Sequence, residues 1–90
     1  MSRSYEILES AHKNGITEEQ IDHVLANEPQ YREDDGEDDK GDSREIVVGY
    51  DFATRLIELV LIYDDSHWDF KVIHANMAQQ PYKGKFLEGI

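Results

Sequence analysis

The sequence predicts a small α+β protein in which an N-terminal helical hairpin packs on a three- or four-stranded antiparallel sheet. Apolar residues recur at helical spacing over the first 27 residues. From residue 46 the pattern changes to the alternation typical of strands, and a polar acidic segment separates the two regions. A chain of 90 residues has room for one small core, so residues 1–90 are expected to form a single domain.

Two helices joined at residues 14–17 are predicted for the N-terminal region. The first covers residues 4–13 and is followed by Asn14 and Gly15, which accept the left-handed conformation that often ends a helix. The second begins at Glu18, because Thr17 and Gln20 have the spacing of a capping box, and it ends before Pro29.

The segment between the helices and the sheet, residues 32–43, has no apolar side chain. Acidic residues outnumber basic ones there, and two glycines add flexibility. Because such a segment buries nothing that offsets the entropy of ordering it, we expect a mobile acidic loop.

Three strands are predicted after this loop. Residues 46–50 alternate, residues 55–63 are apolar at nearly every position and resemble a central strand covered on both faces, and residues 68–75 alternate again. In the last strand His74 shares a face with Val72 and Phe70, so it is expected to be partly buried in line with the core. Pro81 marks a candidate terminal helix, which Gly84 opposes.

Composition restricts the classes of function. The absence of cysteine excludes disulfides, thiolate zinc sites and a cysteine nucleophile. A formal net charge of −11 repels phosphate and argues against a nuclease, although residues 71–90 carry a net positive charge. The longest apolar run is far too short for a membrane span, and no signal peptide is recognisable, so we expect a soluble cytoplasmic protein with no membrane contact.

Metal binding is not indicated. Carboxylates at positions 34, 35, 38 and 39 are calcium-type ligands, but their spacing relative to Gly36 and Gly41 does not fit an EF-hand loop. The four histidines form no pair at zinc-ligand spacing. We therefore expect neither a metal site nor another cofactor.

Several functional side chains fall near the last predicted strand: His74, Lys71, Arg55, Lys83 and Lys85. Cleavage of RNA without a metal needs a proton carrier and cations for the phosphate, which histidine and Arg/Lys supply. Under this hypothesis Lys71, Lys83 and Lys85 contact RNA. The alternative is a satisfied histidine at the edge of the core, with lysines that are ordinary solvated charges.

Three stretches together resemble small bacterial toxins of the BrnT type, which are relatives of the RelE/ParE ribonuclease toxins, and especially a short toxin-like group common in actinobacteria. The stretches, which cover about half of the chain, are AHKNGITEEQIDHVL at residues 11–25, Gly49-Tyr50-Asp51 followed by RLIELV at residues 55–60, and VIHA at residues 72–75 followed by Met77 and Tyr82.

The resemblance implies the toxin of a toxin–antitoxin pair, an mRNA endoribonuclease held inactive by an antitoxin protein. It implies proton transfer by His74, charge stabilisation at the phosphate by Arg55 and backbone binding by Lys13. Gln79 and Gln80 stand where the family usually has an arginine, and Asn14 where a histidine is common, which implies a weak or absent nuclease. The alternative is a non-catalytic acidic protein-interaction module on the same fold.

Overall fold

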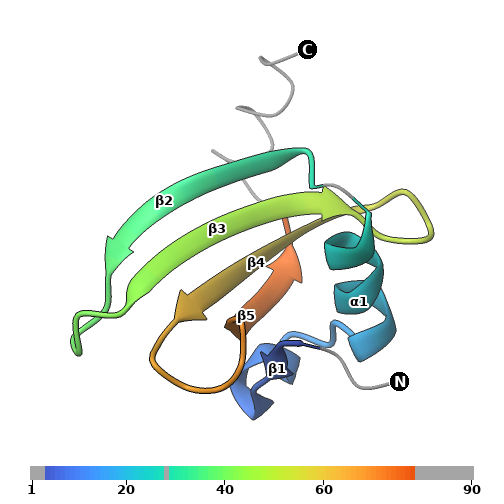
Figure 1. Cartoon of the computed structure of the whole chain (residues 1–90). Helices are drawn as coiled ribbons and strands as arrows, with labels where there is room; N and C mark the ends of the chain where they lie inside the picture. The colour runs from blue at the N-terminus through green and yellow to red at the C-terminus, as the bar shows by residue number, and fades with distance from the viewer. Residues whose placement is uncertain (1–3, 28, 79–90) are drawn as a thin grey trace.

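A computed structural model describes residues 4–27 and 29–78 as a curved sheet with one α-helix against it (Figure 1). The elements are β1 (Glu6–Ile7), the 3₁₀ helix η1 (Glu9–His12), α1 (Glu18–Ala26), β2 (Tyr31–Glu37), β3 (Ser43–Tyr50), β4 (Leu56–Tyr63) and β5 (Lys71–Met77). The predicted α+β class and the packing of a helix on a sheet are confirmed. Within the described ranges, no helix has the length and apolar character needed to cross a membrane.

The sheet has five strands in the order β1-β5-β4-β3-β2. The pairs β2–β3, β3–β4 and β4–β5 are antiparallel, whereas the short β1 runs parallel to β5. The prediction of a purely antiparallel sheet with three or four strands is therefore wrong. The two strands that were not predicted, β1 and β2, lie at the two edges of the sheet. An edge strand pairs with a neighbour on one side only, so its apolar pattern is weak.

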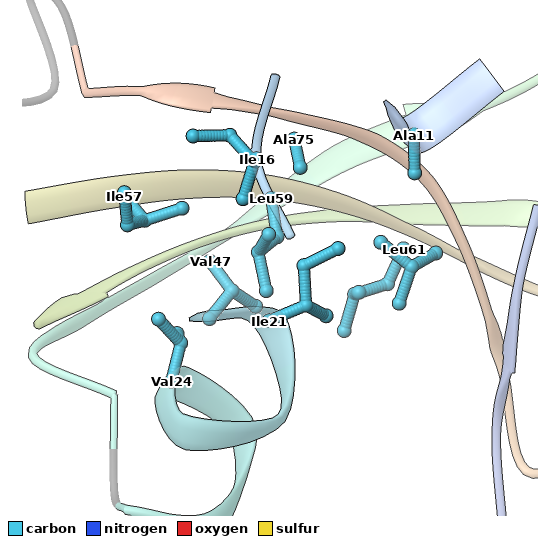
Figure 2. Packing of buried hydrophobic residues seen from close by; sticks show 10 residues of the cluster. Ala11, Ile16, Ile21, Val24, Val47, Ile57, Leu59, Leu61 and Ala75 are labelled. Atoms are coloured by element: carbon cyan, nitrogen blue, oxygen red, sulfur yellow. The ribbon is translucent and has the colours of Figure 1, made fainter. Parts of the chain in front are cut away.

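The main core lies between α1 and the sheet (Figure 2). Helix α1 begins at the predicted capping box, which is confirmed by both of its hydrogen bonds, and buries Ile21 and Val24 against the sheet. A second cluster, Ile46, Val48 and Val60, is buried on the opposite face. Strand β4 contributes to both clusters, which confirms the prediction of a central strand covered on both faces.

The predicted helix over residues 4–13 is wrong, so there is no helical hairpin. Residues 6 and 7 extend along β5, with hydrogen bonds from Glu6 N to Phe70 O (3.2 Å) and from Leu8 N to Val72 O (3.0 Å), and only η1 is helical. Helices of about ten residues are marginal without tertiary support. The edge of β5 offers backbone partners to this segment, and η1 still buries Ala11.

The predicted loop over residues 32–43 is wrong up to residue 37, because this part forms most of β2. Its backbone pairs with β3, and two ion pairs join the strands, Arg32 to Glu45 at 2.8 Å and Arg44 to Asp35 at 3.2 Å. Only the connection from Asp38 to Asp42 is a turn. An edge strand needs hydrogen bonds from one neighbour more than it needs apolar side chains of its own, so a polar composition does not exclude a strand here.

The last strand differs from its prediction in position and facing. It covers Lys71–Met77, and its register with β4 shifts because Val60 lies opposite His74 while Leu61 lies opposite Val72. Ile73 is therefore the extra residue of a β-bulge. The bulge places Val72 on the α1 face and His74 on the opposite face, so the predicted alignment of His74 with Val72 is wrong. The candidate helix from Pro81 lies outside the described residues.

Candidate functional site

His74 lies on the sheet face opposite α1. Its Nε2 atom is 3.5 Å from Oε2 of Glu58 on β4, and its side chain is about one-third exposed, at 37%. The expectation that His74 is partly buried is confirmed. The group beside it is a carboxylate, which can orient an imidazole but cannot stabilise a phosphate.

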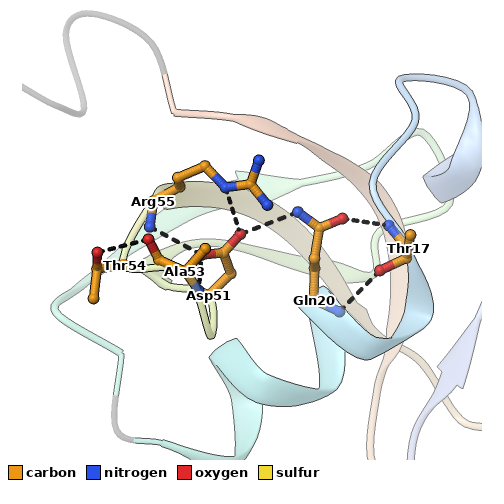
Figure 3. A network of polar contacts seen from close by, with 6 residues as sticks. All are labelled: Thr17, Gln20, Asp51, Ala53, Thr54 and Arg55. Carbon is orange, nitrogen blue, oxygen red and sulfur yellow. Dashed lines mark hydrogen bonds and ion pairs between the residues drawn. The ribbon is translucent and has the colours of Figure 1, made fainter.

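Arg55 directly precedes β4 and points toward the α1 side of the sheet. Its Nε donates to Oδ2 of Asp51 at 3.1 Å (Figure 3). Its side chain is 52% exposed. Arg55 and His74 are therefore directed to opposite faces of the sheet. The structure does not bring these two predicted catalytic residues together.

Lys13 and Lys71, the predicted lysines within the described residues, belong to different elements. Lys13 is exposed at the end of η1, beside Asn14, whose side chain donates to Ala75 O at 3.1 Å. Lys71 begins β5 and binds Asp64, with Nζ to Oδ2 at 2.9 Å. Lys71 lies opposite Ile62, about 20 Å along β4 from the end that carries Arg55. Lys83 and Lys85 lie outside the described residues.

Within residues 4–27 and 29–78, Arg55 and Lys71 are held by carboxylates other than the one that His74 contacts. Arg55, Lys71 and His74 each face a carboxylate. The same part of the chain holds no group of three or more His, Asp or Glu side chains placed to bind a metal ion. Among the described residues, the structure therefore does not bring Arg55 or Lys71 to a common site with His74.

A pocket of about 300 Å³ lies instead where the C-terminal end of α1 meets the turn between β3 and β4. Its lining residues are His23, Asn27, Gln30, Tyr50, Asp51, Phe52 and Thr54. Two of the four exposed large apolar side chains of the described residues, Tyr50 at 37% and Phe52 at 58%, belong to it. The rings of Phe52 and His23 meet edge to face, with centroids 6.1 Å apart.

Asp51 organises the turn beneath this pocket (Figure 3). Its Oδ1 accepts the backbone N–H groups of Ala53 (2.8 Å) and Arg55 (2.9 Å). Its Oδ2 accepts Gln20 Nε2 and Arg55 Nε, both at 3.1 Å. Burial raises the pKa of Asp51, but the hydrogen bonds from Arg55, Gln20 and Ala53 and the charge of Arg55 outweigh it, so the pKa lies below its usual value. The carboxyl group is therefore ionised at neutral pH.

The same turn holds Thr54 with a φ of 59°, in the left-handed region that β-branched residues rarely adopt. Its N–H donates to Asp51 O at 3.0 Å, which closes the turn, and the neighbouring Phe52 side chain stays exposed. Strained residues of this kind persist where the surrounding structure fixes them, often at functional sites. The network around Asp51 is what fixes Thr54.

The pocket was not predicted from the sequence, which placed residues 51–54 only between two predicted strands. One signal was present: the turn DFAT contains an aromatic residue but neither glycine nor proline.

The chain matches no known protein family, no curated protein and no solved structure.

Proposed function

We propose that this chain is a non-catalytic protein-interaction module on a toxin-like fold, and that the pocket lined by Tyr50 and Phe52 is its contact surface. The observation that carries the proposal is the pairing of Arg55, Lys71 and His74 with carboxylates at separate places in the sheet. A surface that cleaves RNA needs these charges free and convergent. A net charge of −11 also disfavours contact with RNA, because it repels phosphate.

Exposed aromatic side chains on a rigid support favour protein contact, because tyrosine and other large rings supply much contact area at small entropic cost. Phe52 and Tyr50 flank a turn that the buried Asp51 holds in place. The resemblance to toxins of toxin–antitoxin pairs supplies the class of partner, a protein encoded beside this one.

The test combines binding and RNA integrity. The full chain, mixed with the protein encoded beside it, is expected to form a complex in size-exclusion chromatography. Phe52→Ser is expected to weaken the complex at least tenfold, as loss of an aromatic hot spot does. Tyr63→Ser is the matched control, because Tyr63 is an exposed aromatic residue (38%) that lies at the other end of β4. A complex unaffected by Phe52→Ser would contradict the proposed surface.

The second candidate function is the endoribonuclease, and the contact between His74 and Glu58 favours it. A carboxylate next to an imidazole is a usual way to orient a general base. Purified wild-type chain is expected to leave total mRNA intact under the first proposal. Cleavage that is abolished in a folded His74→Ala variant would overturn it and establish the nuclease.

A further inference from the structure

The lining of the pocket indicates the charge of the group that binds there. The pocket lies over Asp51 and is formed by His23, Asn27, Gln30, Tyr50, Phe52 and Thr54. Among the described residues, none that lines the pocket is lysine or arginine. Tyr50 and Phe52 are partly exposed, at 37% and 58%, and the faces of aromatic rings are regions of negative electrostatic potential that attract cations.

The end of helix α1 adds to this preference. His23 and Asn27 lie at its C-terminus, where the backbone dipoles place a partial negative charge. His23 O already accepts Asn27 N (3.1 Å) and Asn27 Nδ2 (2.8 Å), so the end of the helix is capped and its direction is fixed.

Asp51 contributes little net charge, because Arg55 balances it at 3.1 Å. Arg55 does not line the pocket, and a chain with a net charge of −11 attracts cations over a longer range. Charge complementarity therefore favours a basic occupant over an acidic or neutral one.

We propose that this pocket receives an arginine or lysine side chain from a basic segment of the partner protein, held against the rings of Phe52 and Tyr50. The proposal rests on the proposed function, since it names the chemistry of the partner at the same surface. A volume of about 300 Å³ accommodates one long side chain.

The experiment titrates the ¹⁵N-labelled full chain with an acetylated hexapeptide that contains two arginines, at physiological ionic strength. The comparison peptide has glutamine in place of both arginines. We expect amide shifts from the arginine peptide at residues 23, 27, 30 and 50–54, and weaker binding of the glutamine peptide.

Phe52→Leu keeps an apolar side chain but removes the ring, and it is expected to raise the Kd two- to fivefold, the value of an exposed cation–π contact. Tyr63→Leu is the matched control and is expected to leave the Kd unchanged. The proposal is overturned if Phe52→Leu binds like the wild type, or if the shifts fall on the acidic strand β2 and not on the pocket.

The outcomes separate this inference from the proposed function. Equal affinity for the two peptides at the pocket would show peptide binding without recognition of charge, which overturns the inference and leaves the interaction module standing. Failure of Phe52→Ser to weaken the complex with the neighbouring protein would overturn both.

Discussion

Gln20 joins helix α1 to the turn between β3 and β4 through a hydrogen bond from its Nε2 to Oδ2 of the buried Asp51, at 3.1 Å. The Oε1 atom of the same side chain accepts Thr17 N at 2.8 Å in the capping box. One amide thus begins the helix and positions it against the turn that carries Phe52. Glutamine suits this position because it supplies both an acceptor and a donor.

Gln20→Glu tests this dual role. The change keeps the capping acceptor but places a second carboxylate against Asp51, so the free energy of unfolding at pH 7 is expected to fall by about 2 kcal/mol. The loss should diminish as the pH is lowered toward 4, because protonation of the introduced carboxyl restores a donor. Urea denaturation at several pH values measures it.

Glu19→Gln is the control for Gln20→Glu, since it changes charge by one unit at an exposed neighbouring position of the same helix. It is expected to change stability by less than about 0.5 kcal/mol. A Gln20→Glu variant as stable as this control at pH 7 would show that the contact with Asp51 is unimportant.

Thr54→Gly is expected to stabilise the protein. The left-handed conformation costs a non-glycine residue roughly 1–2 kcal/mol, and the extra entropy of glycine in the unfolded chain offsets part of the gain. The free energy of unfolding should therefore rise by about 0.5–1 kcal/mol, as measured by chemical denaturation. Ala53→Gly, at a neighbouring turn position outside the left-handed region, should instead lower it by a similar amount. The same sign for both variants would refute strain at Thr54.

Gly49→Ala is expected to destabilise the contact between β3 and α1. A Cβ atom at position 49 would lie 2.9 Å from Cγ1 of Val24, which is buried and has one stiff rotatable bond. The cost should be about 1–3 kcal/mol of unfolding free energy. In a double-mutant cycle, Val24→Ala should make Gly49→Ala less costly, and strictly additive effects would show that the two residues do not clash.

The loss of unfolding free energy at acid pH is expected to depend on Asp51 and Asp64. A hydrogen bond from the Ser66 hydroxyl, with further contributions from Lys71 and the Ser66 N–H, lowers the pKa of Asp64 to about 2. The pKa of Asp51 is also lowered. Because both folded values lie below the unfolded value near 4, their stabilisation is present above about pH 4 and is lost below it, for Asp64 as the pH falls toward 2.

Ser66→Ala tests the cause of the shift at Asp64. Without the hydroxyl donor, the pKa of Asp64 should rise toward its ordinary value of 3.8. The chemical shift of the carboxyl ¹³C, recorded during an acid titration, measures this pKa. Ser10→Ala removes a hydroxyl bonded to Ile73 O and should leave the pKa of Asp64 unchanged. An unchanged titration in Ser66→Ala would assign the shift to Lys71 and to the backbone N–H of residue 66, which the variant keeps.

The sequence by itself determined the features that depend on local chemistry. The capping box of Thr17 and Gln20 sets the start of α1, and the continuous apolar run in β4 marks a strand covered on both faces. These patterns follow from contacts within a few residues or from the periodicity of one element, and they sufficed for the α+β class.

Tertiary structure decided the edge strands, the facing of His74 and the pocket. Residues of β1 and β2 become strands because β5 and β3 offer them backbone partners, which composition does not reveal. The bulge at Ile73 turns His74 away from the α1 face, since one extra residue reverses an alternation of period two. The pocket at Phe52 exists because Asp51 binds Gln20, 31 positions earlier, and a contact over that distance depends on how the helix packs on the sheet.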